Sequence, residues 1–366
     1  MPPENFLYVG TYTQDVPHAK GTNGEGIYVY AFDPTTGELS FQSVRRGIEN
    51  PSFLAITSDN RYLYSVSEGG RAIEGDIVAY SIDSVTGELS PINQASAPGE
   101  GKAYIAVDHS DSWVLAASYS SGMVLLLPIE EDGKLGTVAD VVQHSGNGPN
   151  EKRQEGPHAH CIVADPSNRF AVAVDLGIDR LMVYHLNKPE SGLLPADIPF
   201  FKMEAGSGPR HITFHPNGPY AYVINELNST ATALRFDPAT GSFGMINVLS
   251  TVPEGFNGTN HPADIHVHPS GRFVYGSNRG HNSIVIYSIH EDSGAIQYEG
   301  THPTGGKEPR NFCFDPSGRF LLAANQDSDT IVTLRIDEQT GRLRETGVVT
   351  EVPTPVCLKM ISPDTT

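Results

Sequence analysis

Two positions of a pattern that recurs along this chain hold ionisable side chains that could carry out chemistry. Strand interiors in the repeated units are apolar, whereas these two strand ends turn polar, and their residue types differ from unit to unit. A structural position would tend to repeat one type, so the variation favours a ligand with several distinct groups. The residues are His160, Arg210 and Arg310 at the start of the first strand of a unit, and Glu226, Arg279 and Gln326 at the end of the second.

Arginine and glutamate at these positions could provide anion binding and acid–base chemistry. A guanidinium group binds a carboxylate or a phosphate through two parallel hydrogen bonds, so Arg210, Arg279 and Arg310 are candidate anion ligands. Glu226 among them could act as a general acid or base. The alternative is that the arginines pair with acidic residues to hold neighbouring units together, because structural ion pairs create similar clusters.

Two histidines lie close together, at 158 and 160. In a strand, His158 and His160 would share one face, which could also seat a metal ion. However, a His-x-His pair without a specified third ligand is a weak metal signal, so we predict no metal site. The chain also lacks the glycine-rich nucleotide-binding motifs, the Gly-x-Ser-x-Gly elbow and paired Cys-x-x-Cys, and we expect no cofactor.

The elements that must position these residues belong to seven copies of one unit. Each copy contains short apolar runs bounded by turn residues, as in Asp33-Pro-Thr-Thr-Gly37 and Asp315-Pro-Ser-Gly318, and shows no long 3.6-residue period. Four strands per unit without helices are typical of a β-propeller, so we predict an all-β, seven-bladed propeller with four antiparallel strands per blade. An array of β-sandwiches would need larger units joined by linkers. The glycine that opens the closing phrase recurs as Gly37, Gly87, Gly133, Gly192, Gly241, Gly294 and Gly341.

The two ends of the chain indicate how the ring closes. The first unit begins at once with a second-strand phrase, Phe6-Leu-Tyr-Val-Gly10, whereas a surplus first-strand phrase, Pro355-Val-Cys-Leu-Lys-Met360, follows the last unit. We predict that this C-terminal strand completes the first blade and removes open sheet edges. Residues 1–366 would then form a single domain. Three long connections, 14–25, 143–155 and 253–260, are expected on the face that carries the site.

Charge and composition exclude several classes of function. The chain of 366 residues carries 24 Lys and Arg against 43 Asp and Glu, a formal net charge of −19. Such an acidic protein will not bind nucleic acid or an anionic membrane through general electrostatics. The longest apolar stretch, 123–129, is too short to span a bilayer. Three cysteines do not make a disulfide framework, and the first residues lack a secretory signal, so we expect a cytoplasmic protein, monomeric or weakly homo-oligomeric.

At several of these residues the chain resembles the seven-bladed lactonase family, which contains bacterial β-propeller 6-phosphogluconolactonases and fungal 3-carboxy-cis,cis-muconate lactonizing enzymes. The resemblance covers nearly all of the chain and is most specific at Gly208–Pro216 and Val223–Ser229. It implies a metal-independent site of one histidine, one glutamate and two arginines at the channel mouth. The matching residues are His160, Arg210, Glu226 and Arg279, with His160 favoured over His158 because it is level with Arg210 in the aligned units.

The resemblance implies a lactone hydrolase, with 6-phospho-D-glucono-1,5-lactone as the expected substrate. The arginines would hold the anionic group and stabilise the oxyanion, while Glu226, helped by His160, would activate water. A carboxymuconate lactonizing cycloisomerase would need the same groups, and a propeller that binds without turnover is the third possibility. The residues expected to bind substrate are His158, Asn225, Asn278, Arg310 and Gln326.

Overall fold

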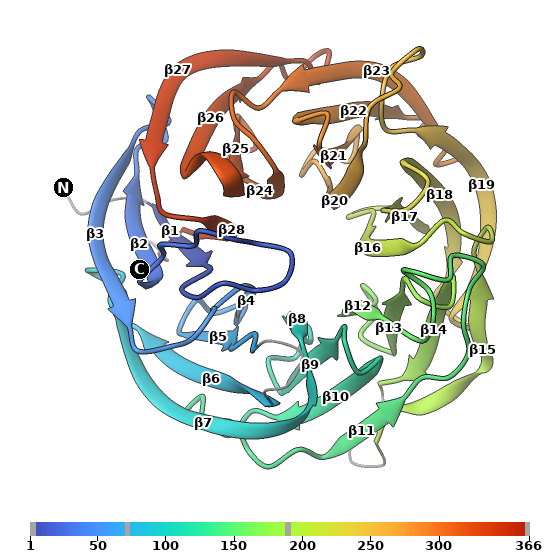
Figure 1. Ribbon diagram of the computed structural model, residues 1–366, viewed down its shortest axis with the longest axis horizontal. Coiled ribbons are helices and arrows are strands. Elements are labelled where there is room, and N and C mark those ends of the chain that lie inside the picture. Colours follow the sequence, from blue (N-terminus) through green and yellow to red (C-terminus); the bar gives the residue numbers. More distant parts are fainter. Residues whose placement is uncertain (1–4, 70–73, 187–191, 363–366) are drawn as a thin grey trace.

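The strands of this protein form a ring of small sheets around a central channel. The computed structural model describes residues 5–69, 74–186 and 192–362. Within these residues there are seven antiparallel sheets of four strands each, arranged as the blades of a propeller (Figure 1). The predicted all-β, seven-bladed architecture is therefore confirmed. No helix in the described part of the chain has the length and apolar character needed to cross a membrane.

Each blade runs from an innermost strand at the channel to an outermost strand at the rim. The first blade has the order β28 (Pro355–Ile361), β1 (Asn5–Thr11), β2 (Gly26–Phe32) and β3 (Leu39–Arg46). The other six blades follow in chain order: β4 (Leu54–Ile56), β5 (Tyr62–Val66), β6 (Glu74–Ile82) and β7 (Leu89–Glu100); β8 (Lys102–Val107), β9 (Trp113–Ser118), β10 (Met123–Pro128) and β11 (Asp140–Gln143); β12 (Ala159–Ala164), β13 (Phe170–Asp175), β14 (Arg180–His185) and β15 (Leu194–Lys202); β16 (Pro209–Phe214), β17 (Tyr220–Asn225), β18 (Thr230–Asp237) and β19 (Ser242–Ser250); β20 (His261–Val267), β21 (Phe273–Arg279), β22 (Ser283–Ile289) and β23 (Ile296–Pro303); β24 (Pro309–Phe314), β25 (Phe320–Asn325), β26 (Thr330–Ile336) and β27 (Leu343–Glu351).

The apolar content of a strand follows its place in the blade. Second strands such as β13 and β17 are buried at every residue, because both of their faces pack against neighbouring blades, and they read as continuous apolar runs. Outer strands such as β27 face solvent on one side and alternate buried or half-buried with exposed residues. The core is therefore a set of apolar layers between blades, which hold the walls of the channel in place.

The recurrent glycine marks a contact between successive blades. Tyr64 donates a hydrogen bond from its hydroxyl to the carbonyl of Gly133 in the next blade, at 2.9 Å, and Tyr8, Tyr222 and Tyr275 make the same bond to their own partner glycines. Gly133 has φ +76°, and a Cβ there would come within 2.2 Å of the Tyr62 ring. Only glycine satisfies both the backbone conformation and this close approach, which explains the strict recurrence.

The ring closes through the two ends of the chain. β28 pairs antiparallel with β1, with Phe6 opposite Ile361 and Val9 opposite Leu358. The expected completion of the first blade by the C-terminal strand is therefore confirmed. Val356, Cys357 and Leu358 are at most 2% exposed, so this strand contributes to the core as well as to the sheet.

Truncation after Thr354 is expected to abolish folding to the native ring. It removes β28, whose buried Val356, Leu358 and Ile361 each contribute about 1.5–3 kcal/mol of burial free energy, a large share of the marginal stability of a domain. It also leaves the edge of β1 unpaired, which favours aggregation. Circular dichroism and size-exclusion chromatography would measure the loss, with truncation after Ser362 as the control. A native-like melting transition in the shorter variant would contradict the closure argument.

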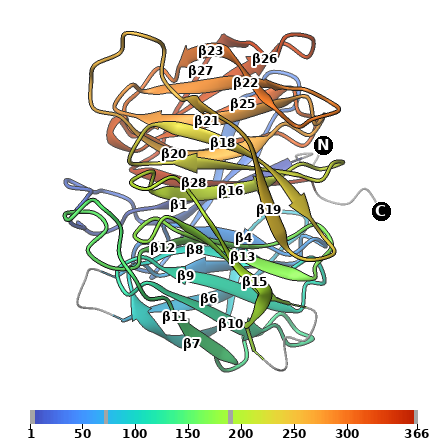
Figure 2. The ribbon, with the colours of Figure 1, turned by 90° about the vertical axis from the view of Figure 1, so that its right-hand side faces the viewer.

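The long connections gather on one side of the ring. Figure 2 shows the dark blue loop after β1, the green loop after β11 and the ochre loop after β19 projecting from the same face. Residues from each of these three connections or the strand that follows, His18, Arg153 and His261, line a common cavity. The face predicted to carry the site is the face on which the loops converge.

Candidate active site

Local irregularities in three innermost strands bring the predicted residues to the cavity. In β12 the pairing with β13 passes from Ala159 to Cys161, so His160 is an extra residue that has no partner in the ladder. Arg210 in β16 and Arg310 in β24 occupy the same extra position. Such β-bulges break the alternation of side chains and re-aim one residue, and they are common next to active sites. The bulges explain why His160, Arg210 and Arg310 all reach the channel mouth.

These side chains line a cavity of about 410 Å³, which is the size of a small-molecule site. Its charged lining contains four arginines, Arg153, Arg210, Arg279 and Arg310, against three carboxylates, Glu68, Glu226 and Glu308. His18, His160 and His261 are also in the lining. The cavity thus carries an excess of positive charge within a protein whose net charge is −19, which favours an anionic ligand.

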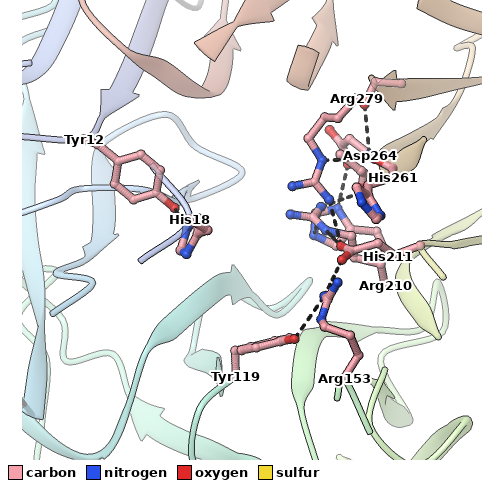
Figure 3. A network of polar contacts seen from close by, with 12 residues as sticks. Tyr12, His18, Tyr119, Arg153, Arg210, His211, His261, Asp264 and Arg279 are labelled. Carbon is pink, nitrogen blue, oxygen red and sulfur yellow. Dashed lines mark hydrogen bonds and ion pairs between the residues drawn. The ribbon is translucent and has the colours of Figure 1, made fainter. Parts of the chain in front are cut away.

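Glu226 is the common ion-pair partner of Arg153, Arg210 and Arg279, whose side chains Figure 3 shows close together. Its Oε1 is 2.5 Å from Nη2 of Arg153, and its Oε2 is 3.0 Å from Nε of Arg210 and 2.8 Å from Nη2 of Arg279. Glu226 directly follows β17, while Arg210 is the second residue of the neighbouring β16 and Arg279 ends β21 of the next blade. Strand ends from two blades and one long loop therefore meet at a single carboxylate.

The positive charges set the ionisation of this cluster. Burial alone would raise the pKa of Glu226, but Arg279, Arg210 and Arg153 together hold that pKa far below its ordinary value. Burial and the neighbouring Arg279 and Arg310 lower the pKa of Arg210 to about 9. The carboxylate is therefore ionised throughout the physiological range, and the arginines are only partly neutralised by it. An anionic ligand would relieve the remaining repulsion among the guanidinium groups.

His160 is held neutral beside this cluster. Burial, followed by the charges of Arg210 and the neighbouring His211, lowers the pKa of His160 well below its ordinary value. Its Nδ1 is buried and has no hydrogen-bond partner among the residues that the structure describes. A neutral imidazole has one acceptor nitrogen, and the ring of His160 lines the cavity, where that nitrogen can accept a hydrogen bond from a water or a substrate hydroxyl.

His211 and Asp264 were not predicted as site residues from the sequence, and they orient the side chain of Arg210. The Nη1 of Arg210 lies 3.2 Å from Nε2 of His211, whose Nδ1 lies 2.8 Å from Oδ1 of Asp264. Because a guanidinium group can only donate, Nε2 of His211 accepts, and Nδ1–H donates to the carboxylate. Arg210 also donates to the carbonyl of Ala263. This chain of bonds fixes the guanidinium group in the channel.

A second wall of the cavity faces the arginine cluster. Figure 3 shows Tyr12 and His18 across the open space from Arg210 and Arg279. The hydroxyl of Tyr12 bonds His18 Nε2 at 2.8 Å and Glu68 at 3.1 Å, and the guanidinium carbon of Arg310 lies 5.6 Å from the centre of the Tyr12 ring. Partial desolvation and the charges of Arg310, Arg279 and Arg210 lower the pKa of His18 below its ordinary value, so this wall offers neutral and acidic groups that suit sugar hydroxyls.

The sequence suggested that the two neighbouring histidines share one face, but of the two the cavity lining contains His160 alone. His158 precedes β12, and the bulge at His160 breaks the alternation between the two residues. The ring of His158 stacks on Tyr119 with centroids 4.5 Å apart, and its Nδ1 bonds the carbonyl of Tyr119. His158 is outside the cavity lining, so its predicted role in binding substrate is not supported by its position.

Three further residues expected to bind substrate also lie outside the cavity lining. The amide of Asn225 bonds Thr230 and Thr232, and that of Asn278 bonds Ser283 and the carbonyl of Thr251. Each precedes a cavity residue, and successive side chains of a strand point to opposite faces, so both amides turn into their own blades. Gln326 begins the 3-10 turn η2 (Gln326–Ser328) and bonds Asp327.

The described residues contain no group of three or more His, Cys, Asp or Glu side chains that could hold a metal ion. The arrangement offers instead a carboxylate to take a proton, guanidinium groups to stabilise an oxyanion, and a neutral histidine. These are the parts needed for hydrolysis or formation of an ester ring.

Comparisons with known proteins agree with this geometry. The family model described as lactonase, 7-bladed beta-propeller matches residues 6–360. A 6-phosphogluconolactonase of Bacillus subtilis is 38% identical over 97% of both chains, and one of Formosa agariphila is 36% identical over 84% of this chain and 85% of its own. The structure of a periplasmic gluconolactonase of Pseudomonas aeruginosa is 31% identical and superposes with a TM-score of 0.90, covering 98% of this chain and 99% of its own. The chain belongs to the seven-bladed β-propeller lactonase family.

Proposed function

We propose that this protein hydrolyses the ring ester of an anionic sugar lactone, with 6-phospho-D-glucono-1,5-lactone as its substrate. The observation that carries the proposal is the cluster of Arg153, Arg210 and Arg279 around the single carboxylate of Glu226, inside a cavity of small-molecule size. Two curated relatives that cover most of this chain are named 6-phosphogluconolactonase. A phosphorylated, electrically negative substrate suits a cavity in which arginines outnumber carboxylates.

In the proposed reaction, water adds to the lactone carbonyl and the bond from that carbon to the ring oxygen breaks. Glu226 accepts a proton from the attacking water, and the carbonyl oxygen becomes an oxyanion that Arg210 and Arg279 stabilise. The protonated Glu226 then returns the proton to the departing ring oxygen, which becomes a hydroxyl group. Neutral His160 would accept a hydrogen bond from the water and orient it. The product is the open-chain hydroxy acid, and the site returns to its starting state.

An assay with three substrates tests the proposal. Purified protein is given 6-phosphogluconolactone, unphosphorylated glucono-1,5-lactone and 3-carboxymuconate, and uncatalysed lactone hydrolysis is subtracted. Loss of charge-assisted hydrogen bonds to the phosphate should reduce kcat/KM for the unphosphorylated lactone by roughly tenfold or more. Turnover of carboxymuconate alone would establish the cycloisomerase instead. Turnover of none of the three would favour a binding protein without catalysis.

Activity is expected to survive exhaustive chelation. The proposed steps use guanidinium groups where other hydrolases use a metal ion, and the described residues offer no metal-binding cluster. The measurement is kcat/KM before and after dialysis against EDTA. Loss of activity with recovery on adding a divalent ion would show that a metal takes part. A cytoplasmic location and a monomeric or weakly associating state stay predictions, to be tested by cell fractionation and light scattering.

A further inference from the structure

We propose that Arg153 determines specificity for the phosphorylated lactone: its side chain moves away from the carboxylate of Glu226 and pairs with the phosphate of the incoming substrate. This inference rests on the proposed function and assigns a role to a residue outside the predicted site. The move would free one oxygen of the Glu226 carboxylate at the moment when substrate is bound. Three observations support it: the division of partners between the two carboxylate oxygens, the exposure of the three arginines and the anchoring of the loop that carries Arg153.

The two oxygens of Glu226 have different partners. Oε2 is shared by Arg210 and Arg279, whereas among the described residues Oε1 has Arg153 as its single ion-pair partner. A carboxylate oxygen held by a guanidinium group is a poor proton acceptor, because the cation stabilises its negative charge. Departure of Arg153 alone would therefore leave Glu226 positioned by two arginines and give it one free oxygen. Arg153 is thus the partner whose movement would activate the base.

The three arginines also differ in how firmly they are held. The side chains of Arg210 and Arg279 are 2% and 12% exposed, and each makes a further bond to a backbone carbonyl. The side chain of Arg153 is 36% exposed, and its other hydrogen bond is to the hydroxyl of Tyr119, at 3.2 Å. A partly exposed arginine with one phenol and one carboxylate as partners can exchange them for a phosphate and keep its own charge paired.

The loop beneath Arg153 is fixed, so the movement concerns the side chain. Gln154 is buried at 0% exposure, its amide nitrogen bonds the carbonyl of Leu176, and its amide oxygen accepts from the backbone of Asn150. The backbone nitrogen of Gln154 bonds Asn150 as well. A long side chain on an anchored backbone can swing between two partners at the same cavity wall.

Charge decides which ligand can draw Arg153 away. A phosphate offers several oxygens and up to two negative charges, so it competes with the one oxygen of Glu226 that Arg153 holds. A neutral lactone has no charged group that could compete with the carboxylate of Glu226 for Arg153, so it would leave Arg153 in place. Phosphorylated substrate would thus both bind Arg153 and release the base, whereas the neutral lactone would do neither.

The test compares Arg153→Ala with the wild type on two lactones. With 6-phosphogluconolactone, kcat/KM is expected to fall by about 10- to 100-fold, the effect of one charge-assisted pair. With glucono-1,5-lactone, kcat/KM is not expected to fall, because Oε1 of Glu226 is free in the variant. Lys152→Ala removes a positive charge from the same loop and is the matched control, with both substrates expected within about twofold of wild type. Equal losses on both lactones in Arg153→Ala would overturn the inference.

Binding of the products separates this inference from the proposed function. Calorimetry with 6-phosphogluconate and gluconate gives affinities that need no turnover. Arg153→Ala should weaken the binding of 6-phosphogluconate at least tenfold and leave the affinity for gluconate unchanged. An unchanged affinity for 6-phosphogluconate would overturn the role of Arg153. Absence of lactone hydrolysis in the wild type would refute the proposed function, and the same calorimetry would still decide the role of Arg153.

Discussion

Replacing Glu226 with glutamine is expected to lower kcat by about 10²–10⁴-fold, the usual contribution of a general acid or base. The change keeps the shape of the side chain and removes the charge that accepts the proton. KM for an anionic lactone should not rise, because Arg153, Arg210 and Arg279 lose the carboxylate that competes with the substrate for them. Steady-state kinetics on the folded variant would measure both constants.

The control for this prediction is Glu308→Gln, which removes another carboxylate of the same cavity lining. It should change kcat by much less than Glu226→Gln does. If Glu226 only holds blades together, its replacement would lower the melting temperature and leave the kinetics of the folded protein nearly intact. Near-normal turnover would remove Glu226 from the mechanism and make His160 the leading base.

The repeats and their closure could be predicted from sequence because each repeat carries its own physical cause. The recurrent glycine is needed wherever an aromatic ring of the neighbouring blade presses on the turn, as at Gly133 beside Tyr62. Turn residues and short apolar runs then mark the strands. Counting four strands in each unit shows that the first unit lacks its first strand and that one strand is left over at the C-terminus. The pairing of β28 with β1 confirms the predicted ring closure.

Several of the predicted residues lie together in the cavity because the aligned columns coincide with real structural positions. His160, Arg210 and Arg310 occupy the same bulge in three blades, which an alignment of units detects without showing that a bulge exists. The bulge itself decides that His160 and not His158 reaches the cavity. A pattern of period two cannot reveal where that period is broken.

Asn225 and Asn278 lie outside the cavity lining for a reason that the sequence does contain. Asn225, Asn278 and Asn325 are one residue type at one position in three blades, and each bonds a hydroxyl five residues later, on Thr230, Ser283 and Thr330. A repeated type indicates a structural position, the criterion by which the varied columns were chosen. Arg153 and His18 were missed because they lie on loops without repeats, where no alignment of units gives them a place.

Replacing Arg279 with alanine is expected to shift the low-pH limit of activity upward. Arg279 is the strongest of the cations that lower the pKa of Glu226, so its loss raises that pKa towards the ordinary value. Glu226 must be ionised to accept a proton, and its ionised form is present only above its pKa. The wild type should therefore keep kcat/KM into acid solution, and the variant should lose it at higher pH. A profile of kcat/KM from neutral pH down to the lowest pH at which both proteins stay folded would measure the shift.

The same variant should also lose about 10- to 100-fold in kcat/KM at neutral pH, because a charge-assisted bond to the substrate or the oxyanion is gone. Arg310→Ala is the matched comparison: it removes a positive charge from the same cavity, but Arg310 stacks on Tyr12 and is not an ion-pair partner of Glu226 within the described chain. It should weaken substrate binding with a smaller movement of the acid limit. Identical acid limits in the wild type and Arg279→Ala would show that Glu226 is not the group whose ionisation governs turnover, since the removal of its strongest neighbouring cation must change its pKa.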